Sequence, residues 1–548
     1  MICRFFTILF FFIAFQGHPQ FLDDAKKKSL NQLLESYIDE GAPGMAVGIV
    51  KDGTTVFESY LGYANLEHRV VVDENTRFNI ASNAKQFTAL CILQLAATGK
   101  LKLEDNIRTY LPDMYQGIDG NITILQLLTH TSGVRDVYDL WDLKGQTWWQ
   151  LFIGNADAMS LLKEQKSLNF EPGTEFLYSN SNYILLAETI KKITETGFDA
   201  YAQSMFHSLG MDQTNFLTNY MEIVPNKARP YGNWNGWKEY PSVTEIYGDG
   251  ALFTTLQDQL RWEAIIQKND GSLLPKKLVS TSQTLVENVN TVSYGFGLMF
   301  GSYKGLDYTY HNGSTGAYNA TFLRFPELNT SIVVLSNNGN ISTDYVAKQL
   351  ADQVLELQEV NMDYPAGPDR IPRKLKIPEI LGSYQSAEGT IITIEAKNDT
   401  IFRKIYQREP VALIQEKGAL YQYASNPDLK IAFEKDQSVV TGFTIYLNSQ
   451  APISYKKLPL LILSEGYKKA LAGTYFNEEI QTTIEIAHVA DNEFVITKNG
   501  LERRAELLYE DLIGMNSYEI RIVRNEDGVI TGLRVKNGRI KNVEFRKH

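Results

Sequence analysis

The sequence predicts an α+β fold, in which an antiparallel sheet with flanking helices and a helical subdomain is followed by two small all-β domains. Hairpin patterns lie near both ends of the region before residue 360, and a mostly helical stretch separates them. Beyond residue 378, short alternating segments are punctuated by turn residues at about every tenth position, which is typical of β-sandwiches and barrels. This tail repeats itself after about 90 residues.

The first elements are a helix and a hairpin. Leucines at helical spacing predict a helix over residues 21–40, and the following Gly-Ala-Pro-Gly segment ends it. Residues 45–50 and 54–60 flank a Lys-Asp-Gly turn, so we expect them to pair as antiparallel strands.

The same domain closes with a second hairpin. Residues 320–325 and 331–336 flank a turn that contains proline and asparagine, and residues 344–359 have the pattern of a helix. Between the two hairpins, residues 86–98 form a predicted helix with one apolar face, which ends at Gly99. Antiparallel hairpins with helices between them favour α+β over a parallel doubly wound fold.

The tail contains two related β modules. The Gly-Ser-Tyr segment that ends at Tyr384 is echoed by Gly-Thr-Tyr at Tyr475, and the Val-Thr-Gly segment that ends at Gly442 is echoed by Ile-Thr-Gly at Gly532. A proline-rich stretch precedes the first module and predicts an extended connector. The predicted parts are a signal peptide, an α+β domain, a proline-rich linker and two β-barrel modules, over residues 1–19, 20–360, 361–378, 379–458 and 459–548.

The N-terminus predicts export. Arg4 precedes an apolar run over residues 5–15, as in a secretory signal peptide, and the run is too short to span a membrane. We therefore expect an exported protein, periplasmic or extracellular, with no stable membrane span after cleavage. Cleavage would also remove Cys3 and leave Cys91 alone, so no internal disulfide is expected.

Composition excludes several classes of function. Hydrophobic residues make up 44% of the 548 residues, as in ordinary globular proteins. The formal net charge of −11 has the wrong sign for a protein that neutralises phosphates, so we expect no nucleic-acid partner. The seven histidines form no His-x-His or His-Glu-x-x-His pair, and no cysteine cluster or phosphate-binding glycine loop occurs, so neither a metal nor another cofactor is predicted.

The remaining chemistry is nucleophilic catalysis. Ser82 and Lys85 lie three residues apart at the start of a predicted helix, where they share one face. A serine hydroxyl becomes a good nucleophile when a neighbouring base removes its proton, and burial near a helix N-terminus disfavours a charged lysine. The spacing is weak evidence by itself, because Ser160 and Lys163 match it too.

Two further motifs follow in the chain. Tyr178 and Asn180 form a Tyr-x-Asn triplet just before an apolar helix, and His311 and Gly313 end an alternating segment. In this order, Ser-x-x-Lys, Tyr-x-Asn and His-x-Gly resemble the motifs of the serine penicillin-recognising superfamily, which includes class C β-lactamases, D,D-carboxypeptidases, carboxylesterases and D-aminopeptidases. The resemblance covers roughly residues 30–355 and implies a β-lactamase/transpeptidase-like fold for this domain.

The resemblance implies a role for each motif residue. Ser82 would attack a carbonyl carbon, Lys85 and Tyr178 would share the proton, and Tyr178 would protonate the leaving group and later help to activate water. Backbone N–H groups of the serine and of Ser314 would form the oxyanion hole, and Asn180 would bind the substrate amide. His311 counts among the catalytic residues, and Gly313 among those that bind substrate.

One departure bears on the substrate. β-Lactamases of this superfamily normally have Lys-Thr-Gly where this chain has His311-Asn312-Gly313. An imidazole is mostly neutral at pH 7, so it binds a substrate carboxylate less firmly than an ammonium does, and a dedicated β-lactamase is disfavoured. A histidine here is similar to some D,D-peptidases and to the D-aminopeptidases, and the latter also carry two C-terminal β-barrel domains.

The sequence therefore predicts an exported serine hydrolase that works through an acyl-enzyme on amide or ester bonds of a small molecule or short peptide, with D-amino-acid peptides or amides as one candidate class. A carboxylesterase or weak β-lactamase would use the same residues. A catalytically idle binding protein that uses its β modules is the alternative from another class. The resemblance implies a structural role for His130, and the aromatic residues Tyr138, Trp141, Trp148 and Trp149 either line a pocket or pack in the core.

Overall fold

A computed structural model gives the fold of the chain. The residues that it describes are 21–240, 243–287, 293–357, 375–387, 390–405, 409–424, 426–437, 439–446, 452–459, 464–490, 493–509, 511–515 and 518–548. The predicted signal peptide, residues 1–19, and most of the predicted linker lie outside the described residues.

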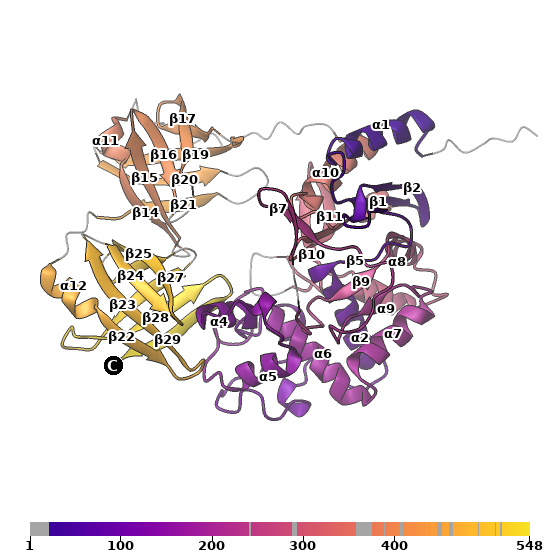
Figure 1. The fold of residues 1–548 in the computed structure, drawn as a ribbon, viewed down its shortest axis with the longest axis horizontal. Helices are drawn as coiled ribbons and strands as arrows, with labels where there is room; N and C mark the ends of the chain where they lie inside the picture. Colours follow the sequence, from indigo (N-terminus) through magenta and orange to yellow (C-terminus); the bar gives the residue numbers. More distant parts are fainter. Residues whose placement is uncertain are drawn as a thin grey trace, which may run out of the picture.

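The first domain is built on one antiparallel sheet with the strand order β10-β11-β12-β13-β1-β2 (Figure 1). Its strands are β1 (Met45–Lys51), β2 (Thr54–Leu61), β10 (Met299–Tyr303), β11 (Leu306–Thr315), β12 (Tyr318–Phe325) and β13 (Thr330–Ser336). The two predicted hairpins form the pairs β1–β2 and β12–β13, and β1 pairs with β13 to join them at the centre of the sheet. The predicted α+β class is confirmed.

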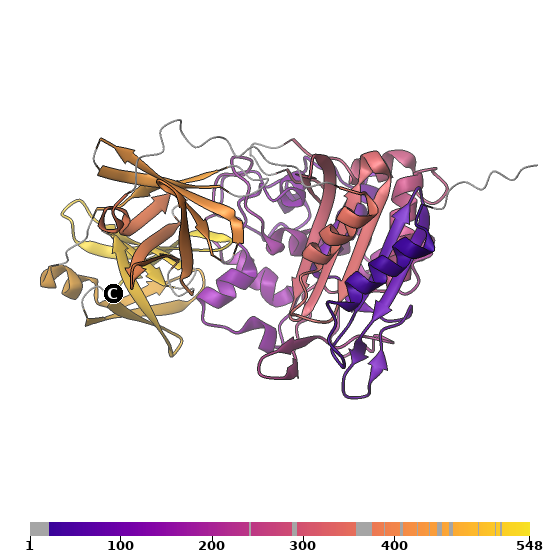
Figure 2. The same ribbon diagram turned by 90° about the horizontal axis from the view of Figure 1, so that it is seen from above.

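Both faces of this sheet are covered. On one face, α1 (Asp24–Glu35) and α10 (Thr343–Val354) pack against alternate strand residues such as Val334. Figure 2 shows these two helices side by side on the sheet. The neighbouring strand residue Val333 points to the opposite face, into the core of the helical subdomain. Strand residues alternate between the two faces, so β13 is buried along its whole length.

The helical subdomain surrounds one central helix. Its helices are α2 (Lys85–Ala97), α3 (Ile124–Leu128), α4 (Val137–Leu143), α5 (Asn155–Lys163), α6 (Asn180–Thr194), α7 (Phe198–Ser208), α8 (Leu256–Lys268) and α9 (Lys276–Ser282). The sequence predicts one apolar face for the helix over residues 86–98, but every residue of α2 from Lys85 to Leu93 is buried. This helix is therefore enclosed on all sides, and its polar residues must find partners inside the protein.

Short strands connect these layers. They are β3 (Tyr63–Asn65), β4 (Val70–Val71), β5 (Phe78–Asn79), β6 (Asn215–Phe216), β7 (Tyr231–Asn233), β8 (Trp237–Glu239) and β9 (Leu252–Thr254). Strand β5 ends just before the turn that carries Ser82, and it pairs with β9. This pairing fixes the nucleophile turn against the segment that contains Asp249.

The tail forms two closed eight-stranded barrels, which confirms the two predicted all-β domains. Barrel 1 consists of β14 (Gly382–Ser386), β15 (Ile391–Lys397), β16 (Thr400–Lys404), β17 (Val411–Lys417), β18 (Leu420–Tyr423), β19 (Asn426–Asp436), β20 (Val439–Tyr446) and β21 (Ile453–Lys457). Barrel 2 consists of β22 (Gly473–Asn477), β23 (Thr482–Ala490), β24 (Glu493–Lys498), β25 (Leu501–Tyr509), β26 (Leu512–Met515), β27 (Tyr518–Arg524), β28 (Ile530–Asn537) and β29 (Ile540–Lys547).

A short helix precedes each barrel, α11 (Ile377–Ile380) and α12 (Glu465–Leu471). Pro378, which the sequence assigns to the extended connector, lies instead in the first turn of α11, where proline costs no hydrogen bond. Within the described residues, none of the helices has both the length and the apolar composition that a transmembrane helix needs.

Candidate active site

The nucleophile candidate lies on a tight turn that leads into the central helix. Ala81 has a φ of +48°, in the left-handed region that costs a residue with a Cβ atom some free energy. The Asn79 side chain stabilises this turn, because its oxygen accepts a hydrogen bond of 2.9 Å from the Ala81 N–H. Ser82 follows at the start of the turn into α2, half-buried and facing a cavity.

Lys85 is fully buried beside Ser82. Its Nζ lies 3.1 Å from Ser82 Oγ, and it also donates to Asn180 Oδ1 at 2.9 Å and to the backbone oxygen of Asp249 at 2.7 Å. Three acceptors match the three N–H bonds of an ammonium group. When Lys85 loses one proton, the contact with Ser82 can reverse, so that the serine hydroxyl donates to the amine.

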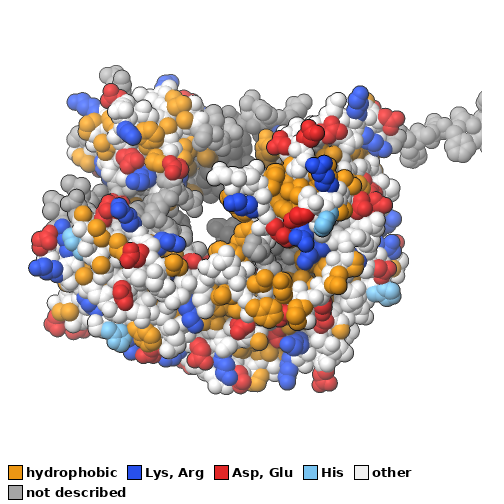
Figure 3. Space-filling view, in the orientation of Figure 1, with side chains coloured by type: hydrophobic (Ala, Val, Ile, Leu, Met, Phe, Trp, Pro, Cys, Tyr) orange, Lys and Arg blue, Asp and Glu red, His pale blue; other side chains and the backbone are white. Residues whose placement is uncertain are grey.

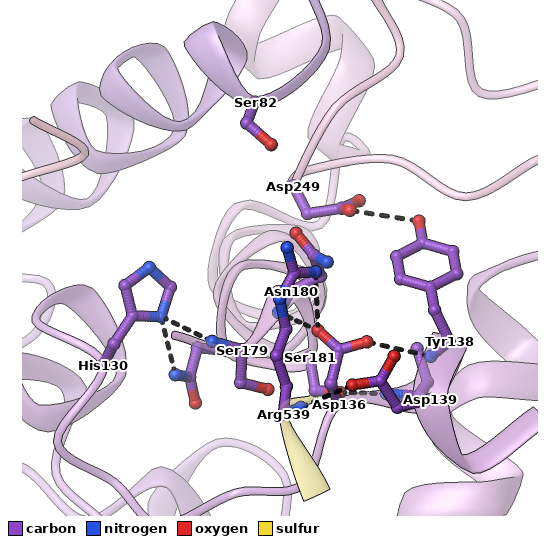
Figure 4. A network of polar contacts seen from close by, with 12 residues as sticks. Ser82, His130, Asp136, Tyr138, Asp139, Ser179, Asn180, Ser181, Asp249 and Arg539 are labelled. Atoms are coloured by element: carbon purple, nitrogen blue, oxygen red, sulfur yellow. Dashed lines mark hydrogen bonds and ion pairs between the residues drawn. The ribbon is translucent and has the colours of Figure 1, made fainter. Parts of the chain in front are cut away.

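Asp136 joins the starts of two helices. Its Oδ1 accepts from the backbone N–H of Tyr138 in the first turn of α4, at 3.0 Å. Its Oδ2 accepts from the backbone N–H of Asn180 in the first turn of α6, at 2.6 Å. A carboxylate is favourable at both helix N-termini, and here one fully buried side chain fixes the Tyr-x-Asn triplet next to α4 (Figure 4).

Tyr178 lies among charged and aromatic groups. Lys85 Nζ is 5.0 Å from the centre of its ring, and Cζ of Arg539 is 4.9 Å from it. The rings of His130 and His311 have their centres 4.2 Å and 6.1 Å from that of Tyr178. The structure thus brings the second motif against the lysine of the first motif and the histidine of the third.

The two histidines are connected by a buried phenol. The Ser179 N–H donates to His130 Nδ1 at 3.2 Å, which leaves the proton of that ring on Nε2. His130 Nε2 lies 3.2 Å from Tyr294 Oη, and Tyr294 Oη lies 3.4 Å from His311 Nε2. In the arrangement that satisfies each contact, His130 donates to Tyr294 and Tyr294 donates to His311.

His311 is neutral in this site. Burial, and then the positive charge of Lys85, lower the pKa of His311 to about 3. Burial and the same lysine also lower the pKa of His130 well below its usual range. The third motif therefore contributes hydrogen-bonding groups but no positive charge near pH 7.

Gly313 allows strand β11 to approach the nucleophile turn. A Cβ atom at this position would lie 2.1 Å from the backbone oxygen of Ile80, closer than any side chain can tolerate. The next residue, Ser314, lines the same cavity as Ser82.

The cavity over Ser82 has a volume of about 990 Å³. Aromatic residues from several elements line it, namely Tyr138, Trp148, Trp149, Tyr240 and Tyr318. Trp141 is buried in the core instead, so the aromatic stretch both lines a pocket and packs in the core. Asp249 also lines the cavity, and burial raises the pKa of its carboxyl group, which accepts a hydrogen bond of 3.0 Å from Tyr138 Oη.

Several residues of the site were not predicted from the sequence. Asp136 carries a local signal, since aspartate directly before an apolar helix is a typical N-cap. Tyr294 and Arg539 carry none, because they reach the site from distant parts of the chain. Among the described residues, no group of three or more His, Cys, Asp or Glu side chains could hold a metal ion.

Comparison with protein families gives one family model, described as Beta-lactamase, which matches residues 30–355. Penicillin-binding protein 4* of Bacillus subtilis (strain 168) is 28% identical over 404 residues, which cover 69% of this chain and 88% of that protein. A D-aminopeptidase of Cereibacter sphaeroides (strain ATCC 17029 / ATH 2.4.9) is 30% identical over 302 residues, which cover 54% of this chain and 57% of that enzyme. The match thus spans little more than half the length of the D-aminopeptidase.

Solved structures agree on the architecture. The octameric penicillin-binding protein homologue from Pyrococcus abyssi superposes with a TM-score of 0.56 and 22% identity over 79% of this chain and all of that one, a likeness that shows the fold alone. A penicillin-binding protein from Bacillus halodurans has a TM-score of 0.51 and 26% identity over 59% of this chain and 98% of that one.

Proposed function

This chain belongs to the Beta-lactamase family, and on that premise we propose that it hydrolyses amide or ester bonds of small substrates through an acyl-enzyme on Ser82. The observation that carries the proposal is the 3.1 Å contact between Ser82 Oγ and the buried amine of Lys85, in the wall of an open cavity. A hydroxyl beside a desolvated amine is the arrangement that a serine nucleophile needs.

In the first half of the reaction, Ser82 Oγ attacks the substrate carbonyl carbon and its proton moves to Lys85. The tetrahedral oxyanion is stabilised by the backbone N–H groups of Ser82 and Ser314, each contributing about 3 kcal/mol to the transition state. The bond to the leaving nitrogen or oxygen then breaks, and Tyr178 supplies the proton that the leaving group takes up, which Lys85 replaces.

In the second half, water attacks the acyl carbon and gives up a proton to Tyr178, which passes its own proton to Lys85. The bond between the acyl group and Ser82 Oγ breaks, the serine regains its proton, and the carboxylic acid leaves. Asn180 holds the substrate amide during both halves, since its side-chain N–H groups are free of Lys85, which contacts its oxygen.

Among substrates, we propose peptides or amides that bear a D-residue. Two observations support this class: the neutral His311, which offers no fixed charge to a substrate carboxylate, and the similarity to proteins named D-aminopeptidase. A carboxylesterase or a weak β-lactamase would use the same groups. We also propose that the protein is exported, to the periplasm or beyond, as the N-terminal sequence suggests.

The test compares Ser82→Ala with Ser160→Ala. Ser160 has a lysine at the same spacing, but it is exposed on α5, so it serves as a matched control. We expect Ser82→Ala to lose turnover by at least about a thousandfold and Ser160→Ala to retain it. Rates on a D-alanyl anilide, a short acyl ester and nitrocefin separate the candidate activities.

Turnover that persists in properly folded Ser82→Ala protein would exclude the mechanism. Failure of every acylating probe to label the wild type would favour the idle binding protein instead.

A further inference from the structure

One turn of barrel 2 reaches into the catalytic cavity. Gly538 and Arg539, between β28 and β29, line the same cavity as Ser82 and Asn180. The backbone N–H of Arg539 donates to Asp139 Oδ2 at 2.6 Å. A Cβ atom at Gly538, which has a φ of +49°, would lie 2.8 Å from the same oxygen, so the turn fits closely against α4.

Contacts on both sides hold this turn in place. On one side, Arg135 donates from Nη2 to the backbone oxygen of Asn542 at 3.0 Å and forms an ion pair with Glu479. Next to it, the Lys541 N–H donates to Asn169 Oδ1 at 2.6 Å. On the other side, Lys498 Nζ donates to the backbone oxygen of Asp142 at 2.7 Å.

The Arg539 side chain then lies between a carboxylate and a phenol ring. Its Nη1 is 3.5 Å from Asp136 Oδ2, the same oxygen that accepts from the Asn180 N–H. Its Cζ is 4.9 Å from the ring centre of Tyr178, within the range of a cation–π contact. Figure 4 shows the guanidinium rising from the barrel strand toward Asp136 and Asn180, below Ser82.

Besides Lys85, Arg539 is a cation that lies over the ring of Tyr178. The titratable and charged groups that surround Tyr178 and Arg539 are Lys85, His130, Asp136, Tyr138, Asp139, Tyr183, Tyr294 and His311. Both histidines are neutral, since burial lowers their pKa values. Burial would lower the pKa of Arg539 as well, but the nearby carboxylates and the phenol outweigh this effect and raise it, so the guanidinium stays charged.

We propose that Arg539 is a positioning residue for Tyr178, contributed to the active site by barrel 2. Its guanidinium holds the phenol ring in place and stabilises the negative charge on the phenol oxygen at the moment when the proton has moved to the leaving group and Lys85 has not yet replaced it. This inference rests on the proposed function, because it assigns Arg539 to the proton transfer in that mechanism.

The experiment measures acylation of the full-length protein by the D-alanyl anilide and by a short acyl ester of an unactivated alcohol, across a pH series, in three variants. The leaving groups of these substrates need a proton, so the step assigned to Tyr178 is measured. Arg539→Met removes the charge, Arg539→Lys keeps it, and Lys541→Met is the matched control. Lys541 lies on the same side of barrel 2 and pairs with Glu175 at 2.8 Å, outside the catalytic groups. We expect Arg539→Met to slow acylation at least about tenfold and to move the falling limb of the pH profile, which reports the proton donor, up by about one unit.

Arg539→Lys should recover part of the rate and most of the pH profile, because the charge is restored without the planar guanidinium. Lys541→Met should stay within about twofold of wild type at each pH. An equal loss in Arg539→Met and Lys541→Met, or a loss in Arg539→Met with an unchanged pH profile, would overturn the proposal. Loss of acylation in Ser82→Ala, measured in parallel, shows that the proposed function stands even if the arginine assignment fails.

Discussion

The two barrels have the same fold but different relations to the catalytic domain. In barrel 1, the buried residues form a hydrophobic cluster of their own, whereas those of barrel 2 belong to one cluster with the helical subdomain. In Figure 3, the surface of barrel 2 continues into that of the catalytic domain. Ion pairs such as Arg135 to Glu479 and Arg539 to Asp136 connect barrel 2 to the active-site helices.

This difference shows that two copies of a repeated module can acquire separate roles through their surfaces. The interiors remain equivalent, because Tyr384 and Tyr475 each donate a hydrogen bond to the carbonyl oxygen four residues earlier, at 2.7 Å and 2.6 Å. The difference lies at the surface, where one turn of barrel 2, at Gly538 and Arg539, lines the cavity. Three predictions test this separation.

The largest effect is expected from Arg135→Met. The Arg135 side chain is 1% exposed, and its removal leaves Glu479 partly buried without its cation. We expect the free energy of unfolding to fall by about 3–5 kcal/mol in urea denaturation. The matched change in barrel 1 is Lys435→Met, which breaks a more exposed pair with Glu379 and should cost less than about 1 kcal/mol. Equal costs would contradict the distinction between the barrels.

A smaller effect on the free energy of unfolding is expected from a change of pH, through Asp139. Burial, and then the neighbouring Asp136, raise the pKa of Asp139 to about 7, compared with about 3.9 in an unfolded chain. The folded protein therefore binds this proton more tightly, and the contribution of Asp139 to stability falls as pH rises from about 4 to about 7. Asp139→Asn should remove about 2–3 kcal/mol of this decline, measured as the difference in unfolding free energy between about pH 5 and pH 8.

An unchanged pH dependence in Asp139→Asn would contradict the raised pKa of this carboxyl group, and with it the burial of Asp139 under the docked turn of barrel 2, where the Arg539 N–H donates to it.

The smallest effects are expected from Tyr384→Phe and Tyr475→Phe. Each removes one buried hydrogen bond while the ring stays in place, so each should lower the unfolding free energy by about 1 kcal/mol. Similar losses by chemical denaturation would support equivalent interiors. A loss several times larger in one barrel would mean that its tyrosine has a further role.

Much of the fold could be predicted because its signals are local. The hairpins at residues 45–60 and 320–336 have alternating patterns and clear turns, and the repeat shows itself in matched tyrosines and glycines. The short strand β10, at the edge of the sheet, was missed, since Met299–Tyr303 contains a glycine and little alternation. The helix over residues 21–40 is shorter than expected, because Asp23 caps it and its last helical residue is Glu35.

The site could be predicted only where the chain carries a motif. Ser82, Lys85 and Asn180 make direct contacts, and the ring of Tyr178 packs between Lys85 and His311. The sequence gives no such signal for Arg539. A single arginine in a turn far along the chain becomes part of the site only because barrel 2 docks onto the catalytic domain. Local patterns cannot reveal a contact that depends on how two domains pack.

The most direct test of the account is to locate a covalent adduct. After reaction with a fluorophosphonate or a slowly released β-lactam, peptide mass spectrometry should find one added group, on the peptide that contains Ser82, and no addition in Ser82→Ala protein. An adduct on another residue, or one that remains in the alanine variant, would contradict the assignment of Ser82 and Lys85 as the reacting pair.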